Sequence, residues 1–121
     1  MATDDGAGIL LDRELIEQIR KIEQATGRND VLSGFVTKLE GTLKGFGASF
    51  SDHVARGDNA GAVRAAHTLK GTCRQLGAIA LGDLFAEVEA VAKAGDFAEA
   101  KRKFDASAAL VTQSIEALKK A

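Results

Sequence analysis

Four residues in the segment "AAHTLKGTCRQLGA", residues 65–78, have types and a spacing that could support phosphoryl chemistry. His67, Lys70, Gly71 and Arg74 stand at positions i, i+3, i+4 and i+7, so they share one face of a helix with about 3.6 residues per turn. A neutral, exposed imidazole is a nucleophile that forms covalent intermediates. A lysine one turn away supplies a cation beside any phosphoryl group on that ring. A glycine one turn away removes the side chain that would obstruct an approaching protein.

Each of these residues also has an ordinary explanation. An isolated exposed histidine or lysine on a helix is most often a solvated side chain. Glycine inside a helix costs about 1 kcal/mol relative to alanine, but other glycines also lie inside expected helices, so Gly71 alone carries little weight. The combination of His67, Lys70 and Gly71 on one helix face, however, indicates a functional site. The sequence offers this nucleophile no companion base, oxyanion loop or metal cluster, which suggests a residue acted on by another protein's active site.

The composition excludes several other classes of protein. The 121 residues, 45% hydrophobic and 27% charged, fit one globular domain. A net charge of -1 leaves no basic excess for nucleic acid. One cysteine and two histidines are too few for a disulfide or a Cys- or His-based metal cluster. No nucleotide-binding glycine motif, long apolar run or secretory signal is present. We therefore expect a cytoplasmic protein with no metal, no cofactor and no membrane contact.

Glycines and periodic apolar residues predict the helices that position this face. The chain has no proline, and Gly27, Gly57, Gly77 and Gly95 each follow a helix-period segment, where a left-handed cap suits glycine. Each segment carries one apolar stripe, so we predict an all-α, antiparallel up-down four-helix bundle with a short additional N-terminal helix. The expected segments are 12–26, 30–56, 60–76, 79–94 and 97–120.

The same pattern sets the expected boundaries. Asp58 or Asn59 is the N-cap after Gly57, while Asp96 and Glu99 have the spacing of a capping box. Residues 12–121 are expected to form the bundle domain and residues 1–11 a flexible N-terminal arm. Two interpretations of residues 9–11 stay open: they staple the arm to the bundle, or they belong to a docking surface for a partner.

The third segment has an apolar face well round the helix from His67. The members of that face are Ala62, Ala66, Leu69, Cys73 and Leu76. We therefore predict that Cys73 packs in the core as a small hydrophobe and that His67 faces solvent. The second histidine, His53, lies near the edge of another apolar stripe, and a structural or surface role is expected for it.

The segment 65–78 resembles the signature of the histidine-containing phosphotransfer (HPt) domain family, which reads approximately aHtLKGsaxxLGa. The matching residues are Ala66, His67, Thr68, Leu69, Lys70, Gly71, Leu76, Gly77 and Ala78. The preceding "ARGDNAGAVRAAH" and the following "LGDLFAEVEAVAKAGD" are also similar to the family, so the resemblance runs from about Leu11 onward. Glu89 stands where the family often carries Glu or Gln near the histidine.

The resemblance implies that His67 accepts a phosphoryl group from the aspartyl phosphate of a receiver domain and passes it to another receiver. Lys70 would stabilise the phosphoryl group and Gly71 would admit the partner. Gln75, where the family often has Asn or Gln, would orient the ring or hold the phosphate, and Glu89 would support the site from the neighbouring helix. The implied partners are receiver domains of response regulators or of a hybrid sensor histidine kinase, which supply the Mg²⁺. The chain itself would be a monomeric phosphocarrier and not an enzyme.

Arg74 departs from the family pattern, because this position more often holds a small residue. It adds positive charge for the phosphate or the acidic receiver pocket, narrows the range of partners, or is a plain surface residue; all three interpretations stay open. The alternative function is a helical-bundle adaptor that docks receiver domains or kinases without being phosphorylated. The joint presence of His67, Lys70 and Gly71 argues against this adaptor.

Overall fold

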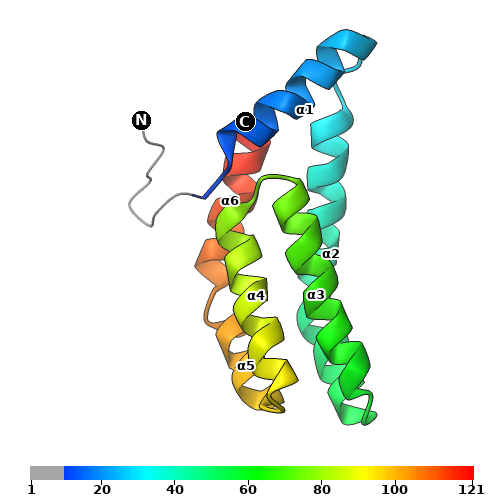
Figure 1. Cartoon of the computed structure of the whole chain (residues 1–121), viewed down its shortest axis with the longest axis vertical. Coiled ribbons are helices and arrows are strands. Elements are labelled where there is room, and N and C mark those ends of the chain that lie inside the picture. Colours follow the sequence, from blue (N-terminus) through cyan, green and yellow to red (C-terminus); the bar gives the residue numbers. More distant parts are fainter. Residues whose placement is uncertain (1–9) are drawn as a thin grey trace.

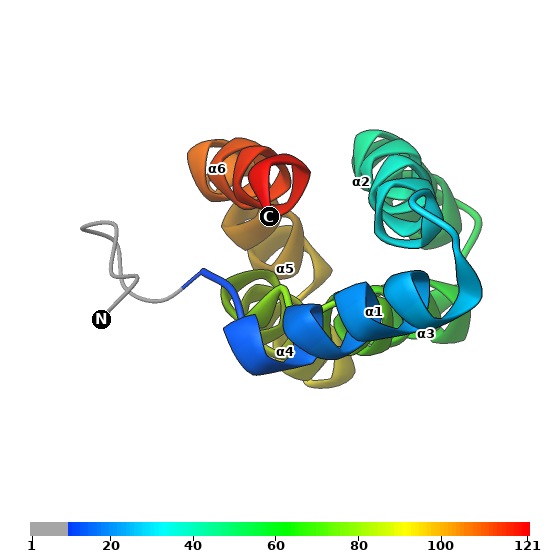
Figure 2. The same ribbon diagram turned by 90° about the horizontal axis from the view of Figure 1, so that it is seen from above.

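The computed structural model describes residues 10–121, which form an all-helical bundle (Figure 1). Its helices are α1 (Arg13–Thr26), α2 (Val31–Ala55), α3 (Asn59–Gln75), α4 (Ile79–Lys93), α5 (Phe97–Asp105) and α6 (Ala108–Lys120). In Figure 1, α2, α3, α4 and the pair α5–α6 alternate in direction, and α1 lies across one end of the bundle, as Figure 2 shows from above. The predicted all-α bundle with an N-terminal helix is confirmed. Among residues 10–121, none of the helices combines the length and the hydropathy that a membrane-spanning helix requires.

The four glycines that were expected to end helices do so in the left-handed conformation. Their φ angles are 72° at Gly27, 74° at Gly57, 80° at Gly77 and 91° at Gly95. A residue with a Cβ is strained at these angles, so glycine is the residue that ends the helices at low cost. The glycine pattern in the sequence therefore located the turns correctly.

Two aspartates cap the helices that follow. Asp58, and not Asn59, is the N-cap of α3, and its carboxylate accepts the N–H of Gly61 at 2.9 Å. Asp96 caps α5 by accepting the N–H of Glu99 at 3.1 Å. The reciprocal half of a capping box is not formed, because the carboxylate of Glu99 pairs with Arg102. The N–H of Asp96 donates to the carbonyl of Val91 instead.

The segment predicted as one helix over 97–120 is two helices, α5 and α6, which meet at Ser107. The hydroxyl of Ser107 donates to the carbonyl of Lys103 at 2.9 Å. That carbonyl is the one the Ser107 N–H would reach in a continuous α-helix, and the N–H bonds the carbonyl of Phe104 instead, at 3.0 Å. Back-bonding by serine thus replaces a rung of the helical ladder. The periodic apolar residues of this segment could not show the break.

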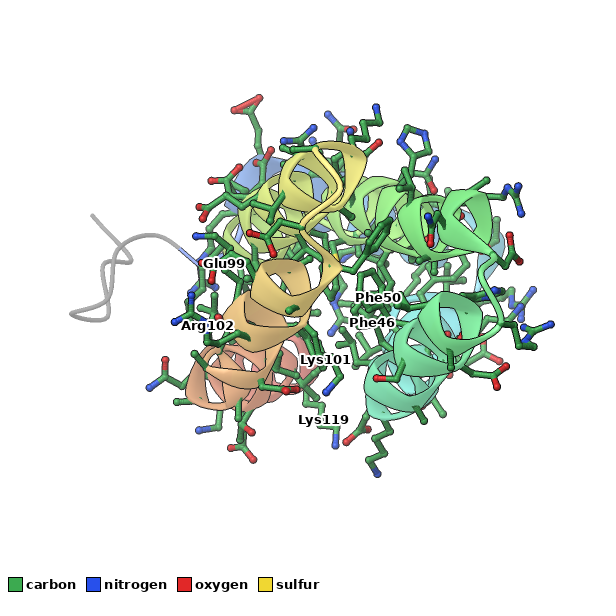
Figure 3. All side chains as sticks on the ribbon, turned by 90° about the horizontal axis from the view of Figure 1, so that it is seen from below. Phe46, Phe50, Glu99, Lys101, Arg102 and Lys119 are labelled. Carbon is green, nitrogen blue, oxygen red and sulfur yellow. The ribbon has the colours of Figure 1, made fainter. Side chains whose placement is uncertain are left out.

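The core lies between the four long rods of the bundle. Figure 3 shows Phe46 and Phe50 pointing from α2 into this interior. The Phe46 ring packs edge-on against Phe85 of α4 and Phe104 of α5, with centroids 5.1 and 4.8 Å apart. These aromatic contacts hold α2, α4 and α5 together and so fix the position of α4, the helix that carries Glu89.

The chain enters the bundle through two buried leucines. Leu10 and Leu11 are 5% and 4% exposed and belong to the core. For these two residues the stapling interpretation holds, and the docking-surface interpretation does not. Ile9 and the rest of the expected arm lie outside the described residues.

A buried carboxylate on α1 caps α2. Glu23 is 4% exposed, and its Oε2 accepts the N–H groups of Val31 and Leu32, each at 2.9 Å. Asp30, the residue in the N-cap position, makes no such side-chain bond. The Leu32 N–H, followed by the Arg20 guanidinium 2.7 Å from Oε1, lowers the pKa of Glu23. Glu23 therefore supplies from another helix the cap that the local sequence does not.

Two further bonds join α1 to distant parts of the chain. The N–H of Asp12 donates to the carbonyl of Gly77, in the turn between α3 and α4, at 2.7 Å. The guanidinium of Arg20 donates to the carbonyl of Ala121 at 2.5 Å. Together with Glu23, these bonds attach α1 at its start, middle and end.

Candidate functional site

His67 lies in the middle of α3 on the side away from the core. Its side chain is 63% exposed, whereas Ala66, Leu69 and Cys73 on the opposite face are buried. Burial raises the pKa of the Cys73 thiol to about 12, so this cysteine is an inert core residue. The predicted solvent-facing histidine and buried cysteine are both confirmed.

Glu89 on α4 is the carboxylate around which the site is built. Its side chain is only 5% exposed, because this face of α4 packs against α3. Oε1 accepts from Nζ of Lys70 at 2.7 Å. Oε2 lies 2.9 Å from Nδ1 of His67 and 3.1 Å from Nζ of Lys93. One buried carboxylate therefore contacts an imidazole and two ammonium groups.

This arrangement determines which ring nitrogen is available. The hydrogen bond from Lys70, with smaller contributions from Lys93 and His67, lowers the pKa of Glu89 to about 2 despite its burial. The carboxylate is ionised at neutral pH and can only accept hydrogen bonds. Nδ1 of His67 must therefore carry the proton that is donated to Oε2. In the neutral ring the lone pair then resides on Nε2, the other ring nitrogen.

Gly71 leaves the surface beside His67 open. Beyond the backbone of its own helix turn, a Cβ built on Gly71 would meet no atom within 4 Å. The glycine is therefore not required by packing inside the described part of the protein. Since it lies one turn from His67, its absent side chain exposes the helix backbone next to the imidazole.

Arg74 and Gln75 lie outside the cluster around Glu89. The stem of Arg74 rests on α4 at Gly82, where a Cβ would lie 2.7 Å from the arginine Cγ. Its guanidinium is 3.7 Å from Oδ1 of Asp83. Gln75 is exposed and lines a groove between α2 and α3 that also includes Phe35. The structure thus joins His67, Lys70 and Glu89 but directs Arg74 and Gln75 elsewhere.

Sequence reasoning missed two cations near the ring. Lys93 reaches Glu89 from one turn further along α4, and Arg64 lines with it the hollow that adjoins His67 between α3 and α4. The position of Lys93 could have been predicted, because it stands four residues after Glu89 and such residues are neighbours on a helix face. The same holds for Arg64, which stands three residues before His67.

The second histidine has a structural contact. Nδ1 of His53 lies 3.0 Å from Oδ2 of Asp58, the residue that caps α3. This agrees with the structural or surface role expected from the sequence. Within residues 10–121, no three His, Cys, Asp or Glu side chains gather as metal ligands would.

Comparisons with known proteins identify a family. A family model described as the Hpt domain matches residues 10–121. Neither the curated proteins nor the solved structures give a match to this chain. The family match covers every helix described above, including the segment with His67.

Proposed function

Since this chain belongs to the Hpt domain family, whose members are phosphocarriers of phosphorelays, we propose that His67 is the residue that carries the phosphoryl group. The supporting observation is the pair formed by an exposed imidazole and a buried carboxylate, with Nδ1 of His67 2.9 Å from Oε2 of Glu89. Hpt domains exchange phosphoryl groups with receiver domains and carry no cofactor. The Mg²⁺ and the acidic residues that the transfer requires belong to the receiver.

The transfer forms one bond and breaks one bond. The lone pair of Nε2 attacks the phosphorus of the receiver's aspartyl phosphate, an N–P bond forms, and the P–O bond to the aspartate breaks, which releases a carboxylate. The proton on Nδ1 of His67 stays in place, so the phosphorylated ring bears a positive charge. Glu89 stabilises that charge through the Nδ1–H bond, while Lys70 lies beside the site and favours the anionic phosphoryl group. The reverse step passes the group to the next receiver.

We propose that the receiver docks on the side of His67 where Gly71 lies. On the helix surface, Gly71 stands between His67 and the groove that α3 forms with α2. That groove contains Leu39 and Leu76, and the exposed Phe35 at its edge is 49% accessible. The exposed ring of Phe35 and the open backbone at Gly71 offer contact area on this side of the nucleophile. Lys70, whose ammonium binds Glu89 on the α4 side of His67, adds positive charge that favours the approach of an acidic receiver.

We further propose that the domain acts as a monomer in the cytoplasm, with a response regulator or a hybrid sensor histidine kinase supplying the receivers. The large exposed apolar side chains among the described residues are Ile22, Phe35 and Ile79. They come from three different helices, which does not favour a continuous apolar interface between copies. Sedimentation velocity at several concentrations tests the monomer, and a concentration-dependent dimer would contradict it.

The experiment for the proposed carrier residue uses a phosphorylated receiver domain with Mg²⁺. The unchanged protein is expected to gain an acid-labile, base-stable phosphoryl adduct, and His67→Gln is expected to gain none. Because His67 is 63% exposed, the variant should keep its helical content and its melting temperature. His53→Gln is the matched control and should be labelled like the unchanged protein.

Each outcome has a clear meaning. Labelling of His67→Gln would place the phosphoryl group on another residue and overturn the assignment. Docking without labelling of the unchanged protein, across a panel of receivers, would favour the unphosphorylated adaptor. Lys70→Ala should still be labelled but with slower transfer or a shorter phosphohistidine lifetime, and unchanged kinetics would remove its proposed role.

A further inference from the structure

Lys93 shares an acceptor atom with the proposed nucleophile. Its Nζ lies 3.1 Å from Oε2 of Glu89, the same oxygen that lies 2.9 Å from Nδ1 of His67. We propose that Lys93 is a positioning residue that keeps the His67 ring unprotonated at Nε2, and so ready to accept a phosphoryl group, by placing a second positive charge on the outer side of Glu89. This inference rests on the proposed function of His67.

A lone carboxylate beside His67 would favour protonation of the ring. An ionised Glu89 beside an imidazole stabilises the imidazolium form, because opposite charges attract. The imidazolium holds a proton on Nε2 and has no lone pair for the attack on phosphorus. A carboxylate that only oriented the ring would therefore also reduce its reactivity. Cations on the carboxylate remove this disadvantage without breaking the Nδ1–H bond.

Two cations are arranged differently around Glu89. Lys70 binds Oε1 and is 23% exposed, so it is a fixed, half-buried partner. Lys93 binds Oε2 and is 64% exposed, so its ammonium lies at the open rim of the site. With Lys70 alone, the pair with Glu89 has no net charge. Lys93 makes the cluster positive, which disfavours a further proton on His67.

The same positive charge favours the phosphorylated state. A phosphoryl group on Nε2 carries about two negative charges, so with the positively charged ring the phosphorylated side chain has a net charge of about -1, whereas the proton that competes for Nε2 brings a positive charge. A cluster with one excess positive charge discriminates between the two by simple attraction and repulsion. Lys93 would therefore favour a phosphoryl group over a proton at Nε2, although Lys93 itself contacts Glu89 and not the ring.

The other charged groups near the ring do not replace Lys93. The charged residues that line the hollow beside His67 are Arg64 on α3 and Glu89 and Lys93 on α4, and Lys70 completes the set from α3. The residue that α5 contributes there is the apolar Phe97. In the described contacts, Lys93 alone shares Oε2 with the imidazole.

The test measures ring protonation directly, in the unphosphorylated full chain, by NMR titration of the two histidine rings. Lys93→Met keeps most of the stem and removes the charge, and Lys93→Arg keeps the charge. In Lys93→Met the pH midpoint of the His67 titration should rise, because the protonated ring would no longer be repelled by the ammonium of Lys93. The midpoint in Lys93→Arg should stay near that of the unchanged protein.

The chain offers two controls. His53 contacts Asp58 and not Glu89, so its titration should not move in Lys93→Met. Lys44→Met removes an equal charge from another Glu–Lys pair four residues apart, formed with Glu40 on α2, and should leave the His67 titration unchanged. An equal shift at both histidines, or an equal effect of Lys44→Met, would reveal a general charge effect and overturn the inference.

Labelling by the phosphorylated receiver then provides a second measurement between about pH 5 and 8, where histidine rings change charge. Lys93→Met should be labelled more slowly than the unchanged protein, and the difference in rate should be larger at the acidic end than at the alkaline end. An unmoved His67 midpoint with normal labelling of the unchanged protein would overturn the role of Lys93 alone. A moved midpoint without any labelling of the unchanged protein would instead overturn the proposed function.

Discussion

Nδ1 of His67 lies 2.9 Å from Oε2 of Glu89, a residue 22 positions further along the chain. The contact joins a side chain that is 63% exposed to one that is 5% exposed. It crosses from α3 to α4, so its geometry depends on the packing of these two helices. The exposed ring is thus held by a buried partner, and this combination gives an accessible nucleophile a defined orientation.

Glu89→Gln should weaken the acid dependence of stability. The pKa of Glu89 is lowered from 4.5 to about 2 in the folded protein, chiefly by Lys70. A lowered folded-state pKa stabilises the fold above the unfolded-state pKa, and this contribution is lost as the pH falls. The unchanged protein should therefore lose more unfolding free energy than Glu89→Gln between about pH 4.5 and 2.

Urea unfolding at a series of pH values measures this difference. Glu87→Gln, on the same helix but 64% exposed in its pair with Lys103, serves as the control and should follow the unchanged protein. Identical pH dependence in Glu89→Gln and the unchanged protein would show that the Lys70–Glu89 contact does not stabilise the fold.

Gly71→Ala should stabilise the fold, while Gly71→Leu should reduce phosphoryl transfer. A Cβ at Gly71 meets nothing within 4 Å, so alanine gains up to about 1 kcal/mol of helix propensity without strain. A leucine there would cover the backbone next to His67. Gly41, in α2, has equally open surroundings, so Gly41→Ala should also stabilise and Gly41→Leu should leave transfer unchanged. Chemical denaturation and labelling rates measure the two effects, and normal transfer by Gly71→Leu would refute the access role.

Arg74 and Gly82 should be energetically coupled. A Cβ at Gly82 would lie 2.7 Å from Cγ of Arg74, so Gly82→Ala forces the arginine stem to move. In an Arg74→Ala background the same change meets no such obstacle and should gain up to about 1 kcal/mol from helix propensity. A double-mutant cycle of unfolding free energies should therefore give a coupling of about 1 kcal/mol. Additive effects would mean that the stem of Arg74 does not rest on Gly82.

Ser114→Ala should raise the stability of the protein. The hydroxyl of Ser114 is fully buried and has no hydrogen-bond partner in the described structure. Burying an unpaired hydroxyl costs about 1–3 kcal/mol, and alanine is also the better helix former. Thermal or urea unfolding should show a gain of about 1 kcal/mol. A clear loss would instead indicate that the hydroxyl is bonded, for example by an internal water molecule.

Much of the fold could be predicted because its signals are local. Glycines at 27, 57, 77 and 95 located the turns, and periodic apolar residues gave the buried faces, including that of α3. The break at Ser107 escaped prediction because it depends on one hydroxyl that bonds the Lys103 carbonyl. The cap that Glu23 provides escaped for a different reason, since it acts on a helix whose own N-cap position already held an aspartate.

The site, like the fold, has features that the sequence predicts and others that depend on tertiary packing. The spacing of His67, Lys70 and Gly71 on one helix is readable from the sequence, because a helix fixes which residues share a face. The proximity of Glu89 was only implied by the family resemblance. The contact of Arg74 with Asp83 depends on how α3 packs on α4. So does the fact that the oxygen bound by Lys93 also contacts His67. Such contacts between helices follow from the tertiary structure and have no signature in either helix alone.

The three attachments of α1 have a consequence for how the protein opens. Asp12 bonds Gly77, Glu23 bonds the start of α2, and Arg20 bonds Ala121. For α1 to separate from the bundle, bonds to three distant segments must break together, so its amide protons should exchange with solvent in one cooperative event and not by gradual fraying. The first amides of α2, which Glu23 caps, would lose their acceptor in that same event. The helix α1, which contributes no residue to the site around His67, thus belongs to the same unit of slow hydrogen exchange as the start of α2.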